Sequence, residues 1–240
     1  RDQGSQSNSG KAMYDVLPLH QLMSPKGNHF AGRAGTGTMQ IRKICLTAAM
    51  VAIVVSIVAA ISFLAYISPP RDETKSFDYP PEFFCAGAEN RIDYQTDGKC
   101  AAYAAAYLLR YVGDDADGEA LFPELKRTLG FVSVNSIVDV FEQHGYQAKA
   151  CHGSVDTLKQ RLAEGNPIIV FIRIPGDTHY AVIVGYEDQY IYLVDSLAEN
   201  ANASDVRYNR VLTTEGFESV WKTDTLLPDN IYIIVKAADR

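Results

Sequence analysis

The sequence predicts an α+β domain preceded by one transmembrane helix. An uncharged apolar run over residues 44–67 comes first, and most predicted helices of the remaining chain precede its predicted strands. Strands that follow one another through short turns pair antiparallel, whereas a parallel sheet needs a helix between successive strands. With 240 residues, 47% of them hydrophobic, the chain can bury one good core. We therefore expect N-terminal helices packed on an antiparallel sheet.

The apolar run over 44–67 predicts a single-pass membrane anchor. It contains 24 residues and no charged side chain, and about 20 apolar residues span the hydrocarbon core of a bilayer as a helix. Arg42 and Lys43 precede it. Because basic residues stay on the cytoplasmic side, the chain after Pro70 is expected outside the cell membrane. A cleaved secretory signal, with a similar basic lead and apolar stretch, is the alternative.

Charge and composition divide the rest of the chain. Residues 1–43 carry six basic and two acidic side chains, a net +4, and their Gly, Ser, Asn and Gln content predicts a disordered cytoplasmic tail. Whether translation starts at Met39 or upstream is left open. Residues 68–81 contain four prolines and are expected to form an extended linker. Residues 71–240 carry sixteen basic and twenty-seven acidic side chains, a net −11, which predicts no nucleic-acid partner because phosphate binding needs clustered Lys and Arg.

The elements of the folded domain, expected over 82–240, follow from caps, breakers and apolar periodicity. Ser133 and Ser154 are typical N-cap residues, and glycines such as Gly145 typically terminate helices. Helices are predicted from Cys100 to Gly113, over 119–129, from Ser133 to Gly145, over 155–164 and over 217–221. β-Branched and aromatic runs predict strands at 147–151, 168–174, 179–187, 190–195 and 231–235.

Two neighbouring strands are expected to bring His179 and Asp195 to the same end of a hairpin. The tight turn at Asp188-Gln189 joins these strands, and residues whose numbers sum to about 375–377 face one another across it. The numbers of His179 and Asp195 sum to 374. The two residues are therefore predicted close to register.

Cys100 is the candidate nucleophile. It opens a helix rich in Ala, Leu and Tyr, and the unpaired N–H groups and positive dipole end of a helix start stabilise a thiolate. Attack of a thiolate on a carbonyl also needs an imidazole, a group that orients it and donors for the oxyanion. His179, Asp195 and Gln95 are the candidates for these roles. The alternatives are a buried structural thiol, a carboxylate that only ends a strand, and an amide that only caps a turn.

Four segments, in this order, resemble a known family. They are Gln-x-x-x-x-Cys from Gln95, His-Tyr-Ala-Val-Ile-Val-Gly-Tyr from His179, Tyr-Ile-Tyr-Leu-Val-Asp-Ser from Tyr190, and Asn-Arg-Val-Leu-Thr-Thr-Glu-Gly-Phe from Asn209 with Trp221 beyond it. Over residues 94–235 the chain resembles the bacteriocin-processing (double-glycine leader) peptidases and their stand-alone relatives, within the papain-like cysteine peptidase superfamily. It departs from many of them at Ala101-Ala102, where Gly often follows the Cys, and alanine there is expected to fill space near the thiol.

The resemblance implies a papain-like fold and a bacterial cysteine peptidase that works through an acyl-enzyme. The implied roles are nucleophile for Cys100, base and acid for His179, orientation of the imidazole for Asp195, and oxyanion-hole donor for Gln95. A peptide or protein substrate is expected, and neither a cofactor nor a metal. An acyl- or peptidyl-transferase on the same scaffold and a catalytically silent peptide-binding domain are the alternatives.

The other cysteines and histidines of this part of the chain are expected to be structural. Outside the membrane an unpaired thiol is a liability, so a disulfide between Cys85 and Cys151 is a hypothesis, with two free thiols as the alternative. His152 has no second ligand pair at zinc spacing, and His144 lies at a predicted helix end, where a cation is favoured.

Overall fold

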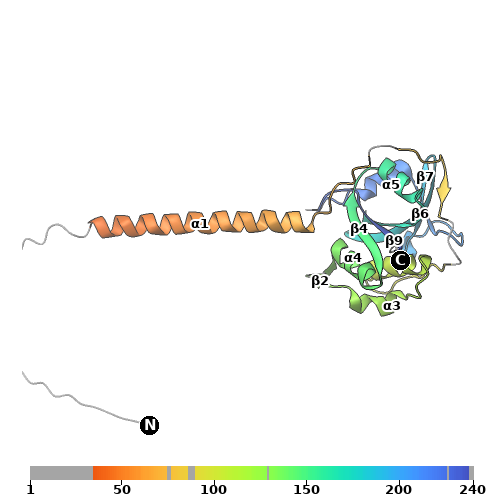
Figure 1. Ribbon diagram of the computed structural model, residues 1–240, viewed down its shortest axis with the longest axis horizontal. Coiled ribbons are helices and arrows are strands. Elements are labelled where there is room, and N and C mark those ends of the chain that lie inside the picture. Colours follow the sequence, from red (N-terminus) through yellow and green to blue (C-terminus); the bar gives the residue numbers. More distant parts are fainter. Residues whose placement is uncertain (1–34, 75–76, 86–89, 129, 226, 238–240) are drawn as a thin grey trace, which may run out of the picture. The chain divides into compact units, whose positions relative to one another are not determined.

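The computed structural model describes residues 35–74, 77–85, 90–128, 130–225 and 227–237 (Figure 1). Most of the predicted tail, residues 1–34, lies outside the described residues. The first helix, α1 (Gly35–Ile67), is continuous over 33 residues, about 50 Å at 1.5 Å per residue. Its stretch Met39–Ala65 is long and apolar enough to cross a membrane, and all of these side chains are exposed. The helix thus begins nine residues before the predicted apolar run over 44–67 and ends with it.

One seven-stranded antiparallel sheet forms the centre of the folded part. Its strands, in spatial order, are β4 (Tyr146–His152), β9 (Ile231–Ala237), β5 (Ile168–Ile174), β6 (Asp177–Glu187), β7 (Tyr190–Val194) and β8 (Arg210–Thr213). The short strand β1 (Phe83–Phe84) pairs with the end of β6. The five predicted strands are confirmed. The sequence pattern does not predict β1 and β8, nor that β9 inserts between β4 and β5.

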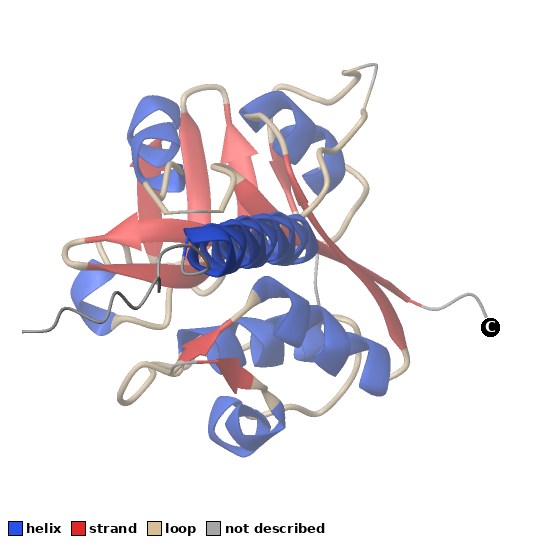
Figure 2. Ribbon diagram, turned by 90° about the vertical axis from the view of Figure 1, so that its left-hand side faces the viewer, coloured by secondary structure: helices blue, strands red, loops and turns tan. Residues whose placement is uncertain are grey.

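Helices cover both faces of this sheet (Figures 1 and 2). The α2 (Cys100–Tyr111) and α4 (Val134–Gln143) helices pack on one face, and α5 (Val155–Leu162) and α6 (Thr214–Trp221) pack on the other. Successive side chains of a strand point to opposite faces, so Tyr180 of β6 joins the α2 core and Ala181 joins the α6 core. A sheet covered on both faces needs unbroken apolar strands, as in β5 and β6. The α+β prediction is confirmed.

The predicted caps of α4 and α5 are also confirmed. The hydroxyl of Ser133 accepts a hydrogen bond from the backbone N–H of Ser136. Ser154 and Thr157 form a reciprocal capping box at the start of α5. These side chains satisfy N–H groups that a helix start leaves without an intrahelical partner.

The predicted helix over 119–129 is wrong. The α-helix there, α3 (Gly118–Leu121), continues as a 3-10 turn, η1 (Phe122–Glu124). Pro123 has no N–H to donate to the carbonyl four residues earlier, so the α-helix cannot run through it. A small hairpin of β2 (Arg127–Thr128) and β3 (Phe131–Val132) follows.

Part of the predicted linker is bound to the folded domain through β4, α5 and β9. The backbone N–H of Asp72 donates to His152 O at 2.8 Å, and the N–H of His152 donates to Pro70 O at 3.0 Å. The Asp72 carboxylate is buried and accepts two hydrogen bonds from Arg161, at 2.9 and 2.8 Å, and one from the Tyr232 hydroxyl. The hydrogen bonds from Arg161 lower the pKa of Asp72 most, so the carboxylate is ionised.

The hypothesis of a Cys85–Cys151 disulfide is wrong, because both thiols are free. Cys85 follows β1, which pairs with β6 on the same side as β5, whereas Cys151 lies on β4, and β9 separates β4 from β5. The two strand spacings from the position of β5 to β4 are about 10 Å, beyond the reach of a disulfide. Burial raises the thiol pKa to about 12 for Cys85 and to about 11 for Cys151, so both are protonated at neutral pH.

Candidate active site

Cys100 is the first residue of α2 and is half-buried. The chain reaches it through a left-handed turn, with φ of +49° at Asp97 and +66° at Gly98. Lys99 O accepts hydrogen bonds from the N–H groups of Ala102 and Tyr103. The earlier N–H groups of the helix have no carbonyl in the helix to bind, so the thiol lies where the helix dipole favours negative charge.

Glu119 of α3 holds the turn that leads to Cys100. Its Oε1 accepts hydrogen bonds from Thr96 Oγ1 at 2.9 Å and from the Tyr103 hydroxyl at 2.8 Å, and its Oε2 pairs with Lys99 Nζ. The hydrogen bond from Lys99, followed by those from Tyr103 and Thr96, lowers the pKa of Glu119 to about 2. One carboxylate therefore ties together residues on both sides of the nucleophile candidate.

Ala101 and Ala102 do not lie free beside the thiol. They are only 2% and 0% exposed and belong to the core between α2 and the sheet. Their methyl groups pack in the core against which Cys100 also lies, and the expectation that they fill space near the thiol stays a prediction.

His179 and Asp195 come together as the hairpin register predicts. Val182 pairs with Val194, and beyond an irregularity Tyr186 pairs with Ile191, so paired residue numbers sum to 376 and 377. His179 Nε2 lies 2.7 Å from Asp195 Oδ1. The two residues are 1% and 0% exposed, respectively.

Asp195 and the Cys100 thiol both act on His179. Burial alone lowers the pKa of His179, but its hydrogen bond with Asp195 and then the influence of the Cys100 thiol outweigh burial and raise this pKa to about 9. Since Nε2 faces Asp195, Nδ1 is the ring nitrogen left for the thiol. This arrangement favours an imidazolium beside a sulfur atom.

Asp195 is held by four hydrogen-bond donors. Besides His179, Oδ1 accepts from the Leu197 N–H at 2.9 Å, and Oδ2 accepts from Asn200 Nδ2 at 3.0 Å and from Arg210 Nη1 at 2.7 Å. Burial raises the pKa of this carboxyl, but the hydrogen bond with His179 and the charges around it outweigh burial and lower it. Asp195 is therefore ionised.

Asn209 fixes the backbone at Asp195. Its Oδ1 accepts from the Asp195 N–H at 2.8 Å, and its Nδ2 donates to Asp195 O at 2.7 Å. Sequence reasoning misses the contacts of Asn200, Asn209 and Arg210 with Asp195, because the strand β8 that places Arg210 is only four residues long. The run Arg210–Thr213, which ends at the N-cap residue of α6, is the pattern that could have indicated a strand.

Gln95 lies beside the end of β7. Its backbone N–H donates to Ser196 O at 2.9 Å, next to Asp195 in the chain. Its side-chain Oε1 is buried and has no hydrogen-bond partner among the residues that the structure describes. The amide oxygen and nitrogen have almost the same shape, so either can occupy that position.

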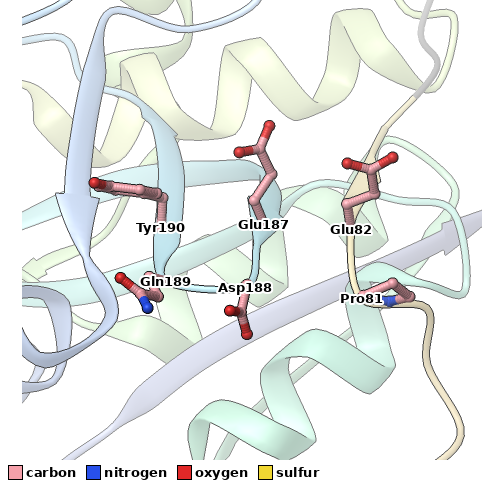
Figure 3. A pocket seen from close by; sticks show the side chains of 6 residues that line it. All are labelled: Pro81, Glu82, Glu187, Asp188, Gln189 and Tyr190. Atoms are coloured by element: carbon pink, nitrogen blue, oxygen red, sulfur yellow. The ribbon is translucent and has the colours of Figure 1, made fainter.

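The surface pocket in Figure 3 is separate from this site. It is lined by Pro81, Glu82, Glu187, Asp188, Gln189 and Tyr190. Glu187 ends β6, eight residues after His179, roughly 26 Å away along an extended strand.

Comparisons with known proteins agree with this fold. The model of the Peptidase_C39 like family matches residues 89–225. The peptidase domain of the bifunctional transporter ComA from Streptococcus is 15% identical, with a TM-score of 0.50, and the match covers 62% of this chain and 99% of that one. A C39-like peptidase from Bacillus anthracis is also 15% identical, with a TM-score of 0.49, covering 65% of this chain and 98% of that one. A search of curated proteins gave no match.

The family match spans more than half of the 240 residues and includes all four predicted site residues. The ComA domain, at its low identity, supports the fold alone. The resemblance to bacteriocin-processing peptidases is thus confirmed at the level of the family. The chain belongs to the C39-like peptidase family, with the papain-like α+β fold of that family.

Proposed function

We propose that the protein is a membrane-anchored cysteine peptidase that hydrolyses peptide bonds outside the cytoplasm. The observation that carries this proposal is the buried hydrogen-bonded pair of His179 and Asp195, with the half-buried Cys100 thiol acting on the same imidazole, in a member of a peptidase family. A thiol, an imidazole that takes up its proton and a carboxylate that orients the imidazole are the groups that thiol-based acyl transfer requires.

In the first half of the reaction, His179 Nδ1 takes the Cys100 proton and the thiolate attacks the substrate carbonyl carbon. The carbonyl oxygen becomes an oxyanion, which the N–H groups at the start of α2 and the Gln95 amide stabilise. When the C–N bond breaks, the imidazolium returns the proton to the leaving amine. Asp195 keeps the imidazole oriented and stabilises its positive charge throughout.

In the second half, water resolves the thioester. His179 takes a proton from the attacking water, a second tetrahedral intermediate forms, and its collapse breaks the C–S bond. The carboxylic acid product leaves, and the proton that His179 took from the water passes to the released Cys100 thiolate, which restores the resting pair. The amine and acid products together account for one water consumed.

The domain map follows the same proposal. Residues 1–43 are the cytoplasmic tail, 44–67 the anchor, 68–81 the linker and 82–240 the catalytic domain. Arg42 and Lys43, just before the apolar run, support the sidedness through the preference of basic residues for the cytoplasmic side. In a membrane fractionation, the full chain should stay in the pellet after an alkaline wash, whereas soluble protein beginning near Ser68 would instead identify α1 as a cleaved signal.

The catalytic proposal is tested with a thiol-directed peptide electrophile at neutral pH. Intact mass of the full chain in detergent, in a Cys45→Ala background because that thiol is exposed, should show one adduct, absent when Cys100→Ala is added and formed at least about 100-fold more slowly with His179→Gln. Cys85→Ala is the matched control and should label like the parent, because burial keeps that thiol protonated.

The outcomes separate the three functions considered. Labelling together with new termini in a peptide mixture supports the hydrolase. Labelling with products formed only when an amine acceptor is added favours a transferase. No labelling of Cys100 would refute both enzymes and leave a peptide-binding domain.

A further inference from the structure

Arg210 reaches the candidate site from the neighbouring strand. It is the first residue of β8 and pairs with Leu193 of β7. Asp195 lies two residues beyond Leu193 and therefore on the same face, so it is the diagonal neighbour of Arg210. The hydrogen bond of 2.7 Å between Arg210 Nη1 and Asp195 Oδ2 spans this diagonal, and Arg210 is only 9% exposed.

This contact differs in kind from the others on the Asp195 carboxylate. Leu197 and Asn200 donate from neutral groups, whereas Arg210 brings a full positive charge into a buried place. With a Cys100 thiolate, a His179 imidazolium and an Asp195 carboxylate, the site carries one net negative charge. Arg210 makes the set of four neutral, and neutrality matters because charges in a water-poor site interact strongly.

We propose that Arg210 is a positioning residue of the active site, which orients the Asp195 carboxylate toward His179 and balances its buried charge. The catalytic role of Arg210 rests on the proposed function, but the titration that tests its effect on His179 does not require peptidase activity. A carboxylate shared between Arg210 and His179 holds the imidazolium less tightly than a carboxylate that faces His179 alone. The imidazolium can then release its proton to a leaving amine more readily.

The structural alternative is that Arg210 only pins β8 to β7. Both roles predict a loss of stability when Arg210 is replaced, so stability cannot separate them. The titration of His179 can. Among the residues that the structure describes, the titratable groups that act on His179 are Cys100 from α2 and Asp195, which directly follows β7, and Arg210 acts on it through Asp195.

The test measures this titration by NMR in the full chain, with 15N-labelled histidine, in detergent micelles. A Cys100→Ala background removes thiol titration and makes the readout independent of peptidase activity. The chain has five histidines, and the His179 signals are identified by their loss in His179→Gln. The variants compared are Arg210→Gln, which keeps a hydrogen-bond donor without the charge, Arg210→Lys, which keeps the charge, and Asn200→Ala, which removes a neutral donor from the same oxygen.

We expect the His179 midpoint to rise by roughly one pH unit in Arg210→Gln, because a nearby positive charge has been removed. It should move by no more than a few tenths of a unit in Arg210→Lys and in Asn200→Ala. An unchanged or lowered midpoint in folded Arg210→Gln overturns the proposal, as does an equal rise in Arg210→Lys. If Arg210→Gln does not fold, Arg210→His replaces it, because an imidazole at position 210 is neutral near the His179 midpoint: a rise relative to Arg210→Lys is then expected, and an unchanged or lowered midpoint overturns the proposal.

Failure of the proposed function would look different. The His179 midpoint would still respond to Arg210, while the chain with Cys100 intact would neither label nor cut peptides. Where peptidase activity is present, the alkaline limb of kcat/KM should move with the NMR midpoint in Arg210→Gln.

Discussion

His179 and Asp195, sixteen residues apart in the chain, face each other at 2.7 Å with almost no exposure to solvent. A buried ion pair of this kind is costly unless further hydrogen bonds satisfy it. The donors from Leu197, Asn200 and Arg210 provide them for Asp195. The site is therefore organised around the carboxylate rather than around the thiol.

Replacing Asp195 by Asn tests that organisation. The amide keeps the shape but loses the charge that stabilises the imidazolium, and its NH2 group would face donors. We expect kcat/KM for peptide hydrolysis to fall by roughly 10²–10⁴-fold, measured by release of new amino termini. Asp205→Asn is the matched control, since Asp205 pairs with exposed Arg207 at the surface, and it should retain parental activity. Parental activity in Asp195→Asn would contradict the assigned role.

The pH dependence of hydrolysis should have its alkaline limb near pH 9. The pKa of His179 is raised from 6.5 to about 9, so the imidazolium that must protonate the leaving amine persists through neutral pH and is lost as the pH passes 9. A pH profile of kcat/KM, measured from pH 5 to 10.5, locates this limb. A limb near pH 6.5 would show that the imidazole is not held by Asp195 in solution.

Much of this site follows from local sequence pattern, and the rest depends on which strands become neighbours. Cys100 and the His179–Asp195 register are predictable because a helix start and a tight hairpin fix geometry over a few residues. Arg210 is not, because its contact needs β8 to pair with β7 across the polar segment after Asp195. The Cys85–Cys151 hypothesis is wrong for the same reason: pairing the two cysteines that remain besides Cys100 takes no account of strand order. The predicted helix over 119–129 is wrong for a local reason, because Pro123 interrupts it.

The buried pair of Asp72 and Arg161 should be a main support of the folded part. The Asp72 side chain is 5% exposed and Arg161 is 25% exposed, so removing the carboxylate leaves a partly buried guanidinium and the Tyr232 hydroxyl without their partner. Asp72→Ala should lower the free energy of unfolding by about 3 kcal/mol, measured by thermal unfolding of the full chain in detergent. The neighbouring exposed Glu73→Ala is the control, expected within about 0.5 kcal/mol of the parent. Equal effects of the two changes would show that residues 70–74 do not hold this contact in solution.

His144 should make stability depend on pH with a sign opposite to that of His152. His144 Nδ1 lies 2.8 Å from Asp114 Oδ2, and this bond, followed by that to Glu124, raises the pKa of His144 above 6.5. A pKa raised by folding stabilises the folded state below the unfolded value, and this contribution is lost as the pH rises through the folded value. The loss of melting temperature in His144→Gln should therefore be larger at pH 5.5 than at pH 9.

His152 supplies the control for that prediction. Burial, and then Arg71, lowers the pKa of His152 below 6.5, so folding favours its neutral form. Its contribution is present above the unfolded value and is lost as the pH falls through the folded one. The cost of His152→Gln should thus be larger at pH 9 than at pH 5.5, the reverse of His144→Gln. The same pH trend in both variants would mean that neither histidine carries the pH dependence, and that a group common to both measurements titrates instead.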